Sequence, residues 1–129
     1  FFIFLFFSYS AYGEVINIDN QKLKKLISDG IIIVDIRTKK EWKTTGIIDK
    51  SNTISLLDEK ERFSIKNWYK KFSKLKLKNN SVVIICAVGG RSFYISKLIN
   101  IKQGNLKIYN LKLGIQKWIS ENNPVSEYR

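Results

Sequence analysis

The residues best suited to chemistry lie together in the segment Cys86–Ser92, which reads CAVGGRS. Cys86 ends the apolar run SVVIIC, which predicts a buried strand, and helical sequence resumes at Ser92. The two glycines between them allow a tight turn whose amide groups face inward and can hold an anion. Arg91 adds a fixed positive charge, and Ser92 can cap the following helix. These features favour the Cys86 thiolate, which is the nucleophilic form of cysteine.

The composition limits what Cys86 can do. The chain of 129 residues holds one cysteine and no histidine. It therefore lacks the residues for an intrachain disulfide, for a thiolate-rich or histidine-bound metal site, and for any mechanism that activates a nucleophile with imidazole. We expect a nucleophilic cysteine that works without a metal or a cofactor. The alternative is a buried cysteine that only packs as a small hydrophobic residue.

The net charge of +12 arises from 23 Lys and Arg against 11 Asp and Glu. Only four of these cations are arginines, and the lysines are spread along the chain from Lys22 to Lys117. Proteins that read nucleic acids usually concentrate arginine and aromatic residues in one patch. We therefore expect a solvated basic surface, no nucleic-acid partner, and steering of small anionic substrates toward the protein.

Residues 1–13 are expected to be the end of a secretory signal whose charged start lies before the given sequence. The apolar run FFIFLFF is followed by small residues, with Ala11 and Gly13 placed for cleavage before Glu14. We expect an exported, periplasmic protein with one domain over residues 14–129. A membrane anchor stays open, although seven apolar residues fall short of the about 20 that span a bilayer. The alternative is a hydrophobic first strand.

From Glu14 onward, apolar runs alternate with amphipathic stretches, which predicts an α/β fold with an open parallel sheet flanked by helices on both faces. The predicted strands are Val15–Ile18, Ile31–Ile36, Thr53–Leu56, Ser81–Cys86 and Leu106–Leu111. Helices are predicted after Asp19 or Asn20, after Thr38 with a capping box to Glu41, as one amphipathic helix over Asp58–Lys78, from Ser92, and from Ile115.

Four segments of the chain, in register, resemble the rhodanese-like sulfurtransferase family. VDIRTKKEW is similar to the family's Asp-x-Arg segment, and CAVGGRS is similar to its active-site loop, Cys-x-x-Gly-x-Arg-Ser/Thr. The segment after Asp-x-Arg in the family, with its glycine, small residue and strand, is similar to TGIIDKSNTISL. The family's closing strand, glycine turn and tryptophan helix are similar to IYNLKLGIQKWISENNPV. The four segments are Val34–Trp42, Thr45–Leu56, Cys86–Ser92 and Ile108–Val125. The resemblance implies the rhodanese-like fold.

The resemblance also implies roles for particular residues. Cys86 would be the catalytic nucleophile. The substrate would be held by the rest of the loop, namely Ala87, Val88, Gly89, Gly90, Arg91 and Ser92. Asp35, Arg37 and Glu41 would form a scaffold around the site. Within this scaffold we expect an ion pair between Arg37 and Glu41 and a second between Glu41 and Arg91, while Asp35 caps backbone amides.

The length of the loop separates two related chemistries. Four residues lie between Cys86 and Arg91, whereas cysteine phosphatases place one more there, which favours sulfur transfer over phosphoryl transfer. By the resemblance, the Cys86 thiolate takes the outer sulfur of an anionic donor such as thiosulfate, and the resulting persulfide passes it to a thiol or a protein acceptor. Ala87 stands where the family often has a basic residue, so the pocket is less cationic. The alternatives are a non-catalytic module that binds a partner through the same loop and a cysteine phosphatase-like enzyme.

Overall fold

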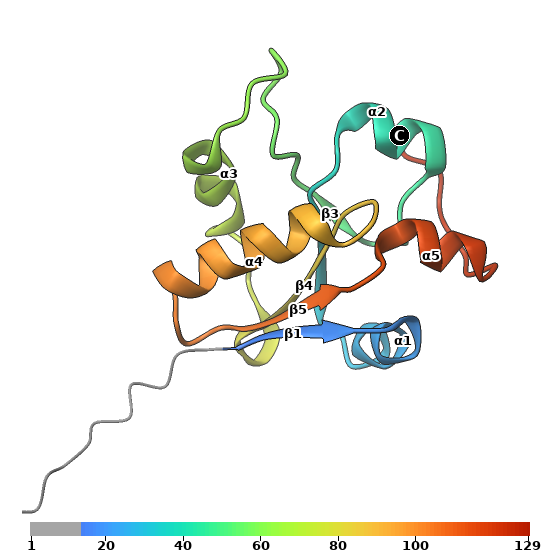
Figure 1. The fold of residues 1–129 in the computed structure, drawn as a ribbon, viewed down its shortest axis with the longest axis horizontal. Coiled ribbons are helices and arrows are strands. Elements are labelled where there is room, and N and C mark those ends of the chain that lie inside the picture. The colour runs from blue at the N-terminus through green and yellow to red at the C-terminus, as the bar shows by residue number, and fades with distance from the viewer. Residues whose placement is uncertain (1–13) are drawn as a thin grey trace, which may run out of the picture.

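The computed structural model describes residues 14–129, and the predicted signal in residues 1–13 lies outside the described residues. Five strands form a parallel sheet in the order β1-β5-β4-β2-β3 (Figure 1). The strands are β1 (Val15–Ile18), β2 (Ile32–Asp35), β3 (Asn52–Thr53), β4 (Ser81–Ile85) and β5 (Lys107–Leu111). The helices are α1 (Asn20–Ser28), α2 (Lys39–Thr45), α3 (Ile65–Phe72), α4 (Gly90–Lys102) and α5 (Gly114–Ser120), and a short 3-10 turn, η1 (Lys78–Asn80), precedes β4. The predicted α/β fold with an open parallel sheet is confirmed.

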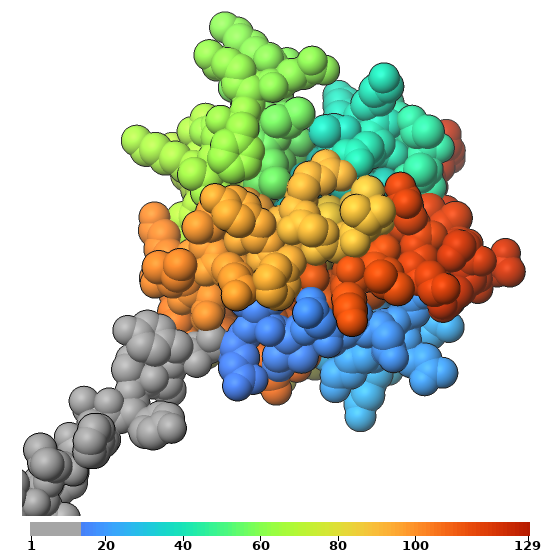
Figure 2. Space-filling model, in the orientation of Figure 1, coloured from blue at the N-terminus to red at the C-terminus, as the bar shows by residue number. Residues whose placement is uncertain are grey.

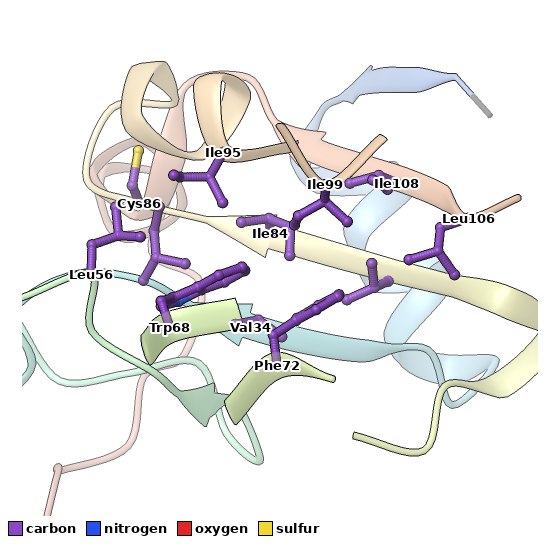
Figure 3. Close-up of a cluster of buried hydrophobic side chains, with 12 residues drawn as sticks. Val34, Leu56, Trp68, Phe72, Ile84, Cys86, Ile95, Ile99, Leu106 and Ile108 are labelled. Atoms are coloured by element: carbon purple, nitrogen blue, oxygen red, sulfur yellow. The ribbon is translucent and has the colours of Figure 1, made fainter. Parts of the chain in front are cut away.

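Helices cover both faces of the sheet because the strands are apolar on both sides. On one face, Trp68 and Phe72 of α3 and Ile95 of α4 pack against strand residues such as Ile84 (Figure 3). On the other face, side chains of α1 and α5 pack against the alternate strand positions. All five residues of β4 are buried, which explains why its sequence is a continuous apolar run rather than an alternating one.

Side-chain caps fix where two of the helices begin. Asp19 accepts a hydrogen bond from the Lys22 amide at the start of α1. At the start of α2, the Thr38 hydroxyl accepts from the Glu41 amide while the Glu41 carboxylate accepts from the Thr38 amide. Both caps were predicted, and both are confirmed, because each depends only on residue types at a fixed local spacing.

The segment Asp58–Lys78 is not one amphipathic helix, so this prediction was wrong. Helix α3 occupies only the middle of the segment, and Ser64 caps its start. Upstream, the Asp58 carboxylate accepts hydrogen bonds from backbone amides two and four residues on, which folds this part into a tight turn. A short antiparallel bridge joins Leu57 and Phe63 across the turn. Phe63 is therefore more than half exposed instead of buried under a helix.

Strand β3 is also shorter than the predicted strand Thr53–Leu56. Only Asn52 and Thr53 pair regularly with β2. The amides of Ile54 and Leu56 still donate to carbonyls at and just after the end of β2, so the chain follows β2 without a regular ladder. None of the helices within residues 14–129 is long and apolar enough to span a membrane.

The carboxyl ends of β2 and β4 define the edge of the sheet at which a site is expected. β4 lies between β5 and β2, and its last residue, Ile85, is level with Asp35 at the end of β2. Ligands of open parallel sheets bind beyond this edge, where the connecting loops leave the strands. The fold therefore brings the loop after Cys86 next to the segment after Asp35.

Candidate functional site

Cys86 is the first residue after β4, in the middle of the sheet's carboxyl edge. Its side chain lies on the face covered by α3 and α4 and belongs to the same buried cluster as Leu56 and Ile95 (Figure 3). The residue has no solvent-exposed surface (0%). Helix α4, of 13 residues, begins just beyond the loop, and the partial positive charge of its N-terminus lies beside the sulfur.

The loop after Cys86 closes around the sulfur atom. Gly89 N–H donates to Cys86 Sγ at 3.1 Å and Ser92 N–H donates at 3.4 Å, while Ser92 Oγ lies 3.2 Å from the same sulfur. The anion nest was predicted from the amides of residues 87–91, and Ser92 contributes to it as well. Donors that are already aimed at the sulfur stabilise a negative charge on it without further rearrangement.

Gly89 makes the tight turn of the loop possible. Its φ of +94° lies in the left-handed region, and a Cβ added there would meet the Lys112 carbonyl oxygen at 1.9 Å. Gly90 is the first residue of α4, and a Cβ added there would meet nothing within 4 Å. The turn therefore requires glycine at position 89 only.

Ser92 does not cap α4, contrary to the prediction. The helix begins two residues earlier, at Gly90, and its N-cap is Gly89, which makes no side-chain hydrogen bond. Ser92 is buried in the first turn of the helix, where its hydroxyl faces Cys86 Sγ, Asn110 Oδ1 and the Gly89 carbonyl. Ser92 Oγ lies 2.5 Å from Asn110 Oδ1. Because a hydroxyl carries one proton, it can donate to only one of these acceptors at a time.

Asn110, in β5, is a site residue that the sequence analysis missed. Its Nδ2 donates to Asn17 Oδ1 at 2.9 Å and to the Gly89 carbonyl at 3.2 Å, and this fixes the amide so that Oδ1 faces Ser92. Asn110 Oδ1 is the nearest of three acceptors of the Ser92 proton, ahead of Cys86 Sγ and the Gly89 carbonyl, which both lie 3.2 Å away. The sequence does carry a signal for this residue, because Asn110 is an asparagine inside the apolar run LKIYNL. A polar side chain in a buried strand needs hydrogen-bond partners, which points to a polar neighbour.

Asp35 and Arg37 form a buried ion pair beside the site. Arg37 Nη2 lies 2.8 Å from Asp35 Oδ2, and Asp35 Oδ1 accepts from the Arg37 amide, as expected of a backbone cap. The guanidinium also donates to Thr45 Oγ1 and to the Gly46 carbonyl. The predicted pair between Arg37 and Glu41 is wrong, because these bonds turn Arg37 toward the end of α2. Its role is to tie α2 to the end of β2.

The second predicted pair, between Glu41 and Arg91, is confirmed, and it is made through two hydrogen bonds. Arg91 Nη2 donates to Glu41 Oε1 at 2.7 Å and Arg91 Nη1 donates to Oε2 at 3.1 Å. These bonds to Arg91, with help from the Thr38 amide, lower the pKa of Glu41 from 4.5 to about 2. The same bonds raise the pKa of Arg91 above its ordinary value. Both side chains therefore stay charged, and the start of α2 is fastened to the loop around Cys86.

Comparison with known proteins identifies the family. Residues 19–121 match the family model described as the Rhodanese-like domain. The chain belongs to the rhodanese-like family. The Rhodanese-like domain-containing protein 17 of Arabidopsis thaliana is 27% identical over an alignment of 116 residues, and the match covers 87% of this chain and 73% of the relative.

Solved structures agree with the rhodanese-like fold. A rhodanese-related protein from Thermoplasma volcanium is 26% identical, with a TM-score of 0.68, and the match covers 88% of this chain and 99% of that one. A polysulfide-sulfur transferase from Wolinella succinogenes is 21% identical, with a TM-score of 0.64 and coverage of 88% and 80%. A rhodanese-like domain protein from Staphylococcus aureus is also 21% identical, with a TM-score of 0.65 and coverage of 88% and 100%.

In this rhodanese-like domain, the loop residues have different surroundings. Gly89 and Ser92 face the sulfur, and Glu41 of α2 holds the guanidinium of Arg91. The Ala87 carbonyl accepts from the Gln116 amide at 3.1 Å, which fastens the loop to α5. Val88 is more than half exposed. The arrangement suits a nucleophile that is negatively charged before and after it reacts, because its donors and its fixed cation are already in place.

Proposed function

We propose that this rhodanese-like domain is a sulfurtransferase in which Cys86 carries the transferred sulfur as a persulfide. The observation that supports this most directly is the enclosure of the Cys86 sulfur by two amides and a hydroxyl. Family membership supports a donor and an acceptor of sulfur in general terms. The identity of both substrates belongs to the proposal.

In the first half-reaction, the Cys86 thiolate attacks the outer sulfur of thiosulfate. A bond forms between the two sulfurs, the sulfur–sulfur bond of thiosulfate breaks, and sulfite leaves with the electron pair. The outer sulfur of the persulfide is then anionic, and the loop amides and the nearby charge of Arg91 stabilise it. In the second half-reaction, an acceptor thiolate or cyanide attacks that sulfur, and the Cys86 thiolate is released. No metal or organic cofactor takes part in either step.

Two alternatives remain distinct from this proposal. A partner-binding module without catalysis is favoured by one observation, the complete burial of Cys86. A cysteine phosphatase-like activity is disfavoured by the loop, which has four residues between Cys86 and Arg91. A shorter loop suits sulfur transfer, because the loop then encloses one sulfur atom rather than a phosphate group.

The test is intact-mass spectrometry of the purified protein after exposure to thiosulfate and, in a second sample, to an inorganic polysulfide. We expect the mass to rise by one sulfur atom, to return to the starting value with cyanide, and to stay constant in Cys86→Ser. The absence of an adduct from both donors, in a folded protein with a free thiol, would overturn the proposal and favour the partner-binding module.

We also propose that the protein is exported to the periplasm. The support is the run FFIFLFF with the small residues Ala11 and Gly13 before Glu14. We expect N-terminal sequencing of the protein isolated from its own cells to begin at Glu14 and fractionation to recover it with periplasmic proteins. A cytoplasmic protein that retains residues 1–13 would refute this proposal.

A further inference from the structure

Apolar side chains gather around the Cys86 loop of a protein whose net charge is +12. Among residues 14–129, seven large apolar residues are exposed, and four of them lie in or beside this loop. These four are Phe63, Val88, Tyr94 and Leu113, each more than half exposed, and we call them the apolar rim. Exposed apolar residues that occur singly are common, but a group of them around one site marks a contact surface.

One side of the rim opens into a cavity next to the loop. The cavity has a volume of about 320 Å³. Phe63 and Tyr94 line it together with Arg91, and its other lining residues are Ile36, Thr38, Leu56, Leu57 and Ile95. Leu56 and Ile95 belong to the buried cluster that contains Cys86, so the cavity lies beside the reacting residue (Figure 3). Its mostly apolar lining suits one large apolar side chain.

The other side of the rim borders the loop from the turn before α5. Gly114 packs so closely against the Ala87 carbonyl that an added Cβ would lie 2.2 Å from it. Leu113 is the neighbour of Gly114 in the sequence, and Val88 is the neighbour of Ala87. Both side chains therefore lie beside the contact between Gly114 and the Ala87 carbonyl. In the space-filling view, the loop lies at the surface between α2 and the turn into α5 (Figure 2). The rim thus flanks the loop on two sides.

The shape and charge of this surface indicate the kind of acceptor. Sites for small molecules are concave and enclose most of the ligand, whereas aromatic side chains that stand out into solvent are typical of protein contacts. A protein with 23 cationic and 11 anionic residues attracts an acidic partner over a distance. Because Cys86 is buried, an acceptor sulfur that reaches the persulfide must bring its neighbouring atoms against the rim.

We propose that the acceptor of sulfur is a cysteine on an acidic protein surface, with a large apolar side chain beside it that enters the cavity between Phe63 and Tyr94. This inference rests on the proposed sulfur transfer. The step is the second half-reaction written above: the partner's thiolate attacks the outer sulfur, its own persulfide forms, and the Cys86 thiolate leaves. Cyanide makes the same attack without touching the rim.

The test compares three probe peptides as acceptors from the Cys86 persulfide. One is an acidic peptide with phenylalanine next to its only cysteine, the second has serine in place of that phenylalanine, and the third has lysines in place of the acidic residues. We expect the first to react about tenfold faster than the second and faster than the third at low salt, a ratio typical of one well-placed apolar anchor. Equal rates for the first two would overturn the proposal, and a third peptide as fast as the first would overturn its acidic part.

Variants show whether the rim causes the preference. For the double variant Phe63→Ser, Tyr94→Ser, we expect the rate ratio between the first two peptides to fall to about one. Ile101→Ser is the matched control, because Ile101 is the most exposed of the seven apolar residues and lies near the other end of α4. It should keep the wild-type ratio. A preference that persists in the double variant would refute the role of the rim, whereas a failure to load Cys86 at all would show in the cyanide reaction and count against sulfur transfer itself.

Discussion

Replacing Asn110 with alanine removes the nearest acceptor of the Ser92 proton. In the wild-type protein Ser92 Oγ lies 2.5 Å from Asn110 Oδ1 and 3.2 Å from Cys86 Sγ. The thiolate can gain a hydrogen bond from this hydroxyl only if the proton turns away from Asn110. A neutral hydrogen bond contributes about 1 kcal/mol net, and the Gly89 carbonyl remains as another acceptor in the variant, so the ratio of thiolate to thiol at Cys86 should rise by up to about fivefold.

The ultraviolet absorbance of the thiolate measures this ratio. Because the chain has one cysteine, the signal belongs to Cys86, and Cys86→Ser supplies the baseline. The charged groups near the loop, chiefly Arg91 and Glu41, are the same in all samples. Asn17→Ala is the matched control, since it also removes a partner of Asn110 but leaves the contact with Ser92 in place. It should keep the wild-type ratio.

A double variant decides whether Asn110 acts through the Ser92 proton. In a Ser92→Ala background, the further change Asn110→Ala should leave the thiolate ratio unchanged, because no hydroxyl proton remains to be released. If the ratio rises equally in that background, Asn110 acts by another route. If the single variant is folded and its ratio equals that of the wild type, Asn110 does not withhold the Ser92 proton from Cys86.

Three further predictions concern the ion pairs of the scaffold and the glycines of the loop. Folding lowers the pKa of Glu41 from 4.5 to about 2, so its ion pair stabilises the protein above pH 4.5, and that contribution is lost as the pH falls toward 2. Between these two pH values the free energy of unfolding, measured with urea, should fall by at most about 1 kcal/mol for this partly exposed pair. Glu41→Gln should not show this fall, and an equal fall in the variant would contradict the role given to the Glu41 carboxylate. Arg37→Leu leaves Asp35 buried without its partner and should lower the free energy of unfolding by about 3–5 kcal/mol, and a loss below about 1 kcal/mol would contradict the role of the pair. Gly89→Ala should cost about 2 kcal/mol or more, from its positive φ and the contact with a backbone carbonyl, whereas Gly90→Ala should be tolerated; equal melting temperatures for the two would count against this account of the loop.

The order of the elements and the position of Cys86 could be predicted because they depend on local patterns. The apolar run SVVIIC predicts a strand buried on both faces, and its end must lie at the carboxyl edge of a parallel sheet. The capping box of α2 is likewise a matter of spacing along the chain. Such features need no knowledge of what packs against them.

The contacts that the sequence could not supply are those between distant segments. By spacing alone, Glu41 is equally suited to Arg37 on its own segment. The pair with Arg91, 50 residues away, was expected from the family resemblance only, because it depends on the packing of α2 beside the loop. Asn110 reaches Ser92 because β5 lies next to β4, an order that the sequence leaves undetermined. The overlong helix prediction failed for a different reason, since the Asp58 turn competes locally with helix formation.

The complete enclosure of Cys86 has a consequence for its unwanted reactions. Exposed lone thiols in an oxidising environment are capped by small disulfides or oxidised step by step to irreversible acids. Here Cys86 has no exposed surface, so a reagent reaches Sγ only when the atoms around the sulfur move, and a bulkier reagent needs a larger movement. Burial would then act as a size filter, slowing the formation of mixed disulfides with bulky thiols far more than attack on a compact sulfur anion.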